Sequence, residues 1–127
     1  MYSSFEDLEV YKDSVKFTAK VYELLKKSPL KEDFAMVDQI RRATISISNN
    51  ISEGFERETD KELIRFLYFS KGSAGEVRNL FNLMEEIGYF DKVDLIEFRN
   101  EIVNISKQLE IILSMLRREM VFSFFTY

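Results

Sequence analysis

Residues 39–54 hold the densest group of side chains that could bind a ligand or one another. In a helix, Ile40, Ile47 and Ile51 form an apolar stripe that Ala43 and Thr44 complete. A second face, at positions i, i+4, i+7, i+8 and i+11, is polar and consists of Arg42, Ser46, Asn49, Asn50 and Glu53. Serine and asparagine form helices poorly because their side chains compete for backbone hydrogen bonds. We therefore expect this polar face to have specific partners.

The expected partners lie in a second group of small and polar residues. Residues 70–76, with the sequence SKGSAGE, interrupt an otherwise apolar helical pattern, and small residues in the middle of a helix usually permit another helix to approach closely. One interpretation is a buried hydrogen-bond network that sets the register of two helices. Its members are Arg42, Ser46, Asn49, Asn50, Glu53, Ser73 and Glu76. The alternative is a ligand or metal pocket that uses Glu53, Glu76 and Asn50. We favour the network and expect neither a metal nor a cofactor.

The absence of histidine and cysteine narrows the chemistry further. It excludes zinc or haem ligation through imidazole or thiolate, cysteine nucleophiles, Ser-His-Asp arrangements and the Glu-x-x-His pairs of di-iron bundles. An alternative is a metal-dependent nucleotide hydrolase with Glu-x-x-Glu pairs, because Glu53 and Glu56 have that spacing. However, Gly54 lies between them at an expected helix end, and Asp91 and Asp94 lie near a loop. We predict that the protein is not an enzyme.

The charge balance bears on nucleic-acid binding. The net charge is −4, from 18 Lys and Arg against 22 Asp and Glu, whereas proteins that bind phosphates usually carry a basic excess. Binding would therefore require folding or assembly to gather basic residues on one face. The candidates are Arg41, Arg57, Lys61, Arg65, Lys71 and Arg78. A solvated face held by salt bridges is the more ordinary interpretation of these residues.

These side chains must be positioned by long helices, because the chain has only 4 Gly and 1 Pro. Breaks are expected at residues 28–31, 54–60 and 88–91. Gly54 and Gly88 are predicted C-caps, and Thr59 or Asp60 and Asp91 are predicted N-caps. Connections this short place neighbouring helices antiparallel. The sequence thus predicts an all-α protein, an antiparallel up-down-up-down four-helix bundle over residues 1–120.

The outer helices differ in their apolar patterns. The last helix shows one stripe, consisting of Leu95, Phe98, Ile102, Ile105, Leu109, Ile112 and Leu116. The first helix shows two stripes. One consists of Leu8, Tyr11, Val15, Tyr22 and Leu25, and the other of Val10, Phe17, Val21 and Leu24. A second apolar face is either a wide core face or an interface with another chain, and we assign the stripe that contains Phe17 to an oligomer interface.

The two ends of the chain carry further signals. Residues 121–127, VFSFFTY, form an apolar aromatic tail, and we expect it to pack in a groove of the same or a neighbouring chain. The N-terminus has no signal-peptide pattern, and no apolar run reaches the roughly 20 residues of a membrane helix. We expect a cytoplasmic protein without membrane contact.

Three ordered motifs resemble a known family. They are residues 5–12 (FEDLEVYK), residues 39–54 with their Arg-Arg-Ala, Ser-Ile, Asn-Ile and Glu-Gly elements, and residues 72–76 (GSAGE). Over residues 5–118 the chain resembles the bacterial four-helix-bundle proteins encoded in ribosomal RNA intervening sequences. Ser52, where relatives more often have Ala, and the aromatic tail depart from the pattern. The resemblance implies a ring-shaped homopentamer, similar to the accessory variability proteins of diversity-generating retroelements, which bind nucleic acid and a reverse transcriptase. It implies no enzymatic reaction.

The functional expectation is therefore a non-catalytic oligomeric binding module. Its partner would be RNA, DNA or a nucleic-acid-processing protein. One alternative is a purely structural protein whose apolar surfaces serve only self-assembly, and another is the carboxylate-dependent hydrolase.

Overall fold

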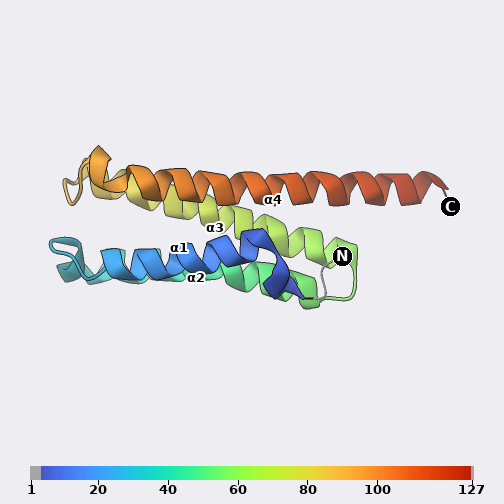
Figure 1. Cartoon of the computed structure of the whole chain (residues 1–127), viewed down its shortest axis with the longest axis horizontal. Helices are drawn as coiled ribbons and strands as arrows, with labels where there is room; N and C mark the ends of the chain where they lie inside the picture. Colours follow the sequence, from blue (N-terminus) through green and yellow to red (C-terminus); the bar gives the residue numbers. More distant parts are fainter. Residues whose placement is uncertain (1–3, 127) are drawn as a thin grey trace.

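Four long helices make up the part of the chain that the structure describes. The computed structural model describes the backbone of residues 4–126 and the side chains of residues 4–121. The helices are α1 (Glu9–Leu24), α2 (Phe34–Glu56), α3 (Asp60–Glu86) and α4 (Lys92–Thr126), with short 3-10 helices η1 (Phe5–Asp7) and η2 (Leu30–Glu32) before α1 and α2. Figure 1 shows α1 beside α2 in one layer and α3 beside α4 in the other.

Polar contacts between helices show their direction. Lys20 of α1 bonds to Glu101 of α4, and Asp13 accepts a 2.8 Å hydrogen bond from Gln108. Residue numbers therefore rise along α1 as they fall along α4, which makes the two helices antiparallel. Each helix also packs on its neighbour in sequence, and α1 packs on α4. The prediction of an all-α four-helix bundle is confirmed.

Local sequence sets most of the helix ends. Thr59 caps α3 by accepting a 3.2 Å hydrogen bond from the Glu62 N–H. Asp91 accepts a 2.9 Å bond from the Asp94 N–H at the start of α4. Gly88 follows α3 with a φ of 84°, a left-handed conformation that glycine adopts without strain. The caps predicted at these three residues are confirmed.

Gly54 does not end a helix, and that prediction was wrong. It is buried inside α2, which continues to Glu56. A Cβ atom at this position would lie 2.9 Å from the Cβ of Phe66 and 3.2 Å from Cδ1 of Leu63. The glycine therefore permits α2 and α3 to pack closely. Because the helix continues, Glu53 and Glu56 lie on the same helix, contrary to the argument that separated them.

The core lies between the four helices and includes a cluster of aromatic rings. The rings of Phe17, Phe81 and Phe98, from α1, α3 and α4, have centroids 5.5 to 6.3 Å apart. The stripe predicted on the last helix faces this core, with Leu95, Ile102, Ile105 and Leu109 buried and Phe98, Ile112 and Leu116 partly buried. The single buried face expected for this helix is therefore present.

The interface assigned to the first helix is corrected by the structure. Val10, Phe17, Val21 and Leu24 are all buried in the core of the single chain. They are not available to a second copy, since α2, α3 and α4 already cover them. Val15 and Tyr22, from the other stripe, are exposed instead. Leu8 and Leu25, at the two ends of that stripe, are buried, so the prediction was wrong in placing the stripe that contains Phe17 outside the core.

The C-terminal tail continues α4. This helix runs without interruption to Thr126, so the predicted boundary at residue 120 does not coincide with a break in secondary structure. Val121 is exposed. The predicted packing of the remaining tail side chains, at 122–127, lies outside the described residues.

Candidate binding surfaces

The centre of the predicted polar network joins α2 to α3. The Ser73 hydroxyl donates to Ser46 Oγ at 3.0 Å, and the Asn50 amide donates to the same oxygen at 2.9 Å. Below them, the buried Ser70 hydroxyl donates a 2.8 Å bond to the backbone carbonyl of Ile47. Ser70 was not predicted as a member of the network, although it is a polar residue in the apolar stripe of α3.

The other residues predicted for the network do not take part in it. Arg42 pairs with Asp38 at 2.9 Å and Glu53 pairs with Arg57 at 3.1 Å, both within α2 and both at exposed positions. Asn49 is exposed as well. Glu76 accepts a hydrogen bond from Gln39 rather than from a serine or asparagine. The reason is geometric: α3 covers only one edge of the polar face of α2, and the rest of that face meets solvent.

The acidic residues do not gather into a metal site in the described part of the chain. No group of three or more acidic side chains there is arranged to hold an ion. Within the same residues, every buried side-chain nitrogen or oxygen has a hydrogen-bond partner. The geometry therefore offers no orphaned polar group that would point to a metal or ligand pocket at Glu53, Glu76 and Asn50.

The basic candidates divide into separate groups. At the α2–α3 end, Arg57 and Arg65 lie over the Phe66 ring, 4.8 and 5.8 Å from its centroid. Arg57 is also held by Glu53, and Arg65 by Glu62 at 3.5 Å. Lys61, in the first turn of α3, is exposed at the same end.

Arg41 stands apart from this group, because it stacks on Tyr22 of α1 at 5.9 Å. Lys71 faces α4, where Lys71 and Arg117 bond to the Glu110 carboxylate at 2.8 and 3.0 Å. These two cations hold the pKa of Glu110 at about 2. The structure thus brings Arg57, Lys61 and Arg65 to one end of the bundle but leaves Arg41 on another face.

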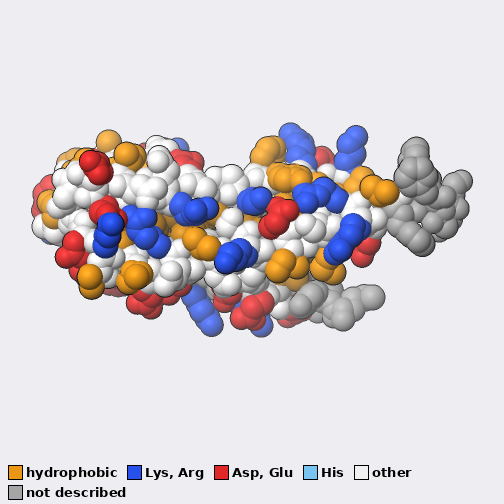
Figure 2. Space-filling view, turned by 90° about the horizontal axis from the view of Figure 1, so that it is seen from above, with side chains coloured by type: hydrophobic (Ala, Val, Ile, Leu, Met, Phe, Trp, Pro, Cys, Tyr) orange, Lys and Arg blue, Asp and Glu red, His pale blue; other side chains and the backbone are white. Residues whose placement is uncertain are grey.

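A basic surface appears along α3 and α4. Figure 2, seen from above α4, shows Lys and Arg side chains along the middle of this face, with acidic side chains between them and along its edges. Arg78 lies seven residues after Lys71, on the same side of α3, and Lys107 lies one turn before Glu110 on α4. Both are exposed, as is Arg118. Lys107 and Arg118 were not among the predicted basic residues, although their positions outside the apolar stripe of α4 could have indicated them.

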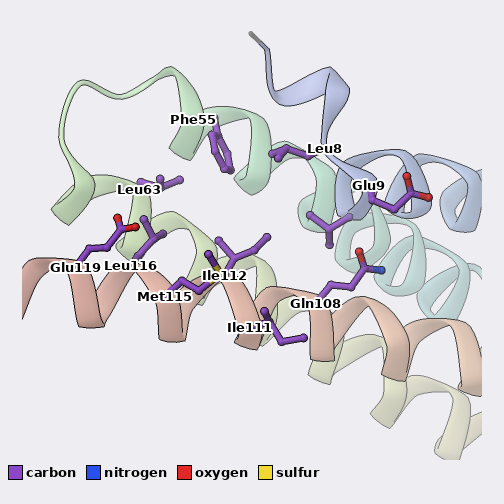
Figure 3. Close-up of a pocket in the computed structure, with 11 residues that line it drawn as sticks. Leu8, Glu9, Phe55, Leu63, Gln108, Ile111, Ile112, Met115, Leu116 and Glu119 are labelled. Atoms are coloured by element: carbon purple, nitrogen blue, oxygen red, sulfur yellow. The ribbon is translucent and has the colours of Figure 1, made fainter. Parts of the chain in front are cut away.

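An apolar groove opens at the end of the bundle where α1 begins. Its volume is about 410 Å³, and its lining is mostly aliphatic and aromatic: Leu8, Val10, Phe55, Leu63, Ile111, Ile112, Met115 and Leu116, with Glu9, Gln108 and Glu119 as polar members. Figure 3 shows Phe55 and Leu63 on one side and the α4 residues on the other. A hollow with this lining suits apolar side chains of a protein partner better than a charged substrate.

The outer face of α3 combines large apolar side chains with glycines. Phe69, Leu83 and Ile87 are exposed there. A Cβ atom added to Gly72 or Gly75 would meet no described heavy atom within 4 Å. The close approach of another helix, which we expected from these small residues, therefore does not occur at the two glycines within the described chain.

The family follows from comparison with known proteins. Residues 6–110 match the 23S rRNA-intervening sequence protein family, which covers most of the bundle. The chain belongs to this family. The resemblance based on the three sequence motifs is thereby confirmed, and no curated protein matches the chain.

A solved structure extends the comparison with the intervening sequence protein family. The chain is similar to the crystal structure of a protein of unknown function from the S23 ribosomal protein family of Bacteroides thetaiotaomicron. The two share 25% identity with a TM-score of 0.77, over 82% of this chain and 97% of that chain. The likeness concerns the helical bundle.

Two features complete the description of this intervening sequence protein. Its family match ends at residue 110, whereas α4 continues to Thr126 and carries Ile111 and Met115 at the lip of the groove. Among the described residues, no helix combines the length and the apolar character needed to cross a bilayer.

Proposed function

We propose that this intervening sequence protein is a subunit of a homo-oligomer that acts in the cytoplasm as a non-catalytic binding module. Its partner is RNA, DNA or a nucleic-acid-processing protein. The observation that carries the proposal is the outer face of α3, where exposed apolar side chains flank two uncovered glycines. The family resemblance favours a ring of five copies.

Gly72 and Gly75 support assembly because they lower the stability of helix α3, and no close contact within the described chain compensates for that loss. Each glycine in a helix interior costs about 1 kcal/mol relative to alanine. Gly72 and Gly75 leave room for the backbone of a second helix to come close, and Phe69 and Leu83 supply apolar area on either side. A second copy that packs here would bury both features.

The basic surface along α3 and α4 supports a nucleic-acid partner. Arg78, Lys107 and Arg118 are exposed on it and make no ion pair within the described residues. Such a surface can attract phosphates although the net charge of the chain is −4. Repetition of this surface in an oligomer would increase its attraction for phosphates.

Sedimentation at micromolar concentration tests the assembly. We expect the wild type to sediment as an oligomer and the Leu83→Glu variant as a smaller species, because the new carboxylate would be buried in the contact. Val93→Glu is the matched control, since Val93 is an exposed apolar residue at the start of α4. A monomeric wild type would contradict the proposal, as would equal masses for the wild type and Leu83→Glu.

Gel-shift titrations with structured RNA and duplex DNA test the binding role. Binding should weaken steeply as salt rises, and the double variant Arg78→Glu/Lys107→Glu should bind at least tenfold more weakly. The double variant Lys12→Glu/Lys16→Glu, at exposed positions of α1, makes the same change in net charge and is the control. Absence of any shift at low salt, together with no protein captured from cell extract, would favour the purely structural alternative.

A further inference from the structure

The apolar groove lies where α1 begins, because α1 starts well short of the end of α4 (Figure 1). Asp13 of α1 accepts a hydrogen bond from Gln108 of α4. Since the two helices are antiparallel, four residues before Asp13 are level with four residues after Gln108, so Glu9 lies level with Ile112. Beyond this level α4 continues to Thr126 without α1 beside it.

The residues that precede α1 leave its axis instead of prolonging it. Leu8 has an extended backbone, with φ −72° and ψ 133°, and η1 packs on α1 and α2. The rings of Phe5 and Tyr11 meet with their centroids 5.0 Å apart, so the chain folds back beside the first turn of α1. Residues 4–7 therefore leave the line of the α1 axis open beyond Glu9.

This open space has the surroundings of a helix. α1 packs on both α2 and α4, and the same two helices line the groove beyond it, with Phe55 from α2 and Met115 from α4, while α3 adds Leu63 (Figure 3). On α4 the lining reaches Glu119, seven residues past Ile112, which corresponds to a rise of about 10 Å, or about two helical turns. The groove therefore suits a short amphipathic helix in the position where α1 would continue.

The charges at the groove indicate which helix would fit. Its lining includes two carboxylates, Glu9 and Glu119, and no lysine or arginine among the described residues. Both are exposed, and neither makes an ion pair within the described chain. The groove would repel phosphates, whereas lysine or arginine near the ends of a bound helix would pair with the two carboxylates.

We propose that the groove binds an amphipathic helix of another protein, which has an apolar face of about two turns flanked by lysine or arginine. The apolar side chains pack between Phe55, Leu63 and Met115, and the basic side chains pair with Glu9 and Glu119. This contact deepens the proposed binding role, on which it rests, by naming the chemistry of a protein partner. It uses neither the outer face of α3 nor the basic surface along α3 and α4.

Fluorescence anisotropy with labelled synthetic peptides and the full-length chain tests the contact. The probe is a capped alanine-based peptide of about 16 residues, with three leucines at spacings of three and four and a lysine on each side of them. Control peptides carry alanine in place of the leucines or glutamate in place of the lysines. We expect the probe to bind, the alanine peptide not to bind, and the glutamate peptide to bind about fivefold more weakly. No binding of the probe, or equal binding of the alanine peptide, would overturn the inference.

Variants of the chain test where the probe binds. Met115→Gln should weaken binding about tenfold, because it removes apolar contact area from the groove. Met120→Gln is the matched control, since Met120 is exposed on another side of α4 and does not line the groove. Equal binding by both variants would overturn the inference.

Charge reversal tests the role of the two carboxylates. The double variant Glu9→Lys/Glu119→Lys should prefer the glutamate peptide to the lysine probe. Glu23→Lys/Glu86→Lys makes the same change in net charge at exposed positions outside the groove lining and should keep the wild-type preference. A preference that changes equally in both variants would contradict the pairing with Glu9 and Glu119.

Oligomer mass distinguishes a helix of another protein from a second copy of this chain. Met115→Gln should leave the wild-type mass unchanged, and a smaller mass would show that a second copy fills the groove and overturn the inference. Peptide binding by a chain that gives no gel shift would reject the nucleic-acid role and leave this contact standing. Gel shifts without peptide binding would do the reverse.

Discussion

The Tyr89 hydroxyl donates a 2.7 Å hydrogen bond to Oδ2 of Asp33, while Oδ1 of Asp33 accepts a 3.0 Å bond from the Met36 N–H. Asp33 is the N-cap of α2, and Tyr89 lies in the connection from α3 to α4. The pair therefore ties together two connections at one end of the bundle. The bonds from Met36 and Tyr89 lower the pKa of Asp33, and the bond to Asp33 raises the pKa of Tyr89.

Replacing these two residues should destabilise the chain to different degrees. Asp33→Ala removes both the N-cap hydrogen bond from Met36 and the hydrogen bond from Tyr89, whereas Tyr89→Phe removes only the hydrogen bond from Tyr89. We expect the melting temperature, followed by circular dichroism, to fall more for Asp33→Ala. Lys31→Ala, at an exposed position in η2, is the control. An equal fall in melting temperature for the two variants would show that the N-cap contributes nothing to stability.

Stability should depend on pH through Glu110. Lys71 and Arg117 lower its pKa from 4.5 to about 2. The unfolded chain therefore binds this proton first, so the stabilisation is present above about pH 4.5 and is lost as pH falls toward 2. Melting temperatures between these values should fall less steeply for Glu110→Gln than for the wild type. Glu86→Gln, an exposed residue without an ion pair in the described chain, should retain the wild-type slope, and an unchanged slope in Glu110→Gln would contradict the assignment.

Two glycine substitutions should have opposite effects. Gly54→Ala should lower the free energy of unfolding by about 1–3 kcal/mol, since the new Cβ crowds the Cβ of Phe66. Gly75→Ala should raise it by up to about 1 kcal/mol, because alanine favours the helix and meets open space. Urea titrations in the Leu83→Glu background remove any contribution from assembly through α3. A lower free energy of unfolding for Gly75→Ala in this background would contradict the finding that a Cβ atom at this position meets open space.

The corrected role of Phe17 can be tested directly. Phe17→Ala should lower the free energy of unfolding by about 3–5 kcal/mol because the side chain is fully buried. Tyr22→Ala, at an exposed position of the same helix, should lower the free energy of unfolding much less. If Phe17→Ala instead reduced the oligomer mass while leaving the stability of the chain unchanged, Phe17 would belong to an interface after all.

Local sequence was enough to predict the helices and several of their ends. A cap is decided within a few residues, so Thr59, Gly88 and Asp91 could be assigned from the residue type and its neighbours. Gly54 could not be assigned in this way. A glycine that ends a helix and a glycine that admits another helix are the same in the sequence, and the contact with Phe66 distinguishes them.

The sequence by itself determined the fold class, the family and the single core stripe of α4, because helical periodicity and capping are local properties. Only the tertiary structure decided which stripe of α1 faces the core, since both stripes are apolar and the choice depends on the helices that cover them. The tertiary structure also decided that Ser46, Asn50 and Ser73 meet while Arg42 and Glu53 face solvent. Partners from distant parts of the chain are set by packing, and spacing along one helix does not encode them.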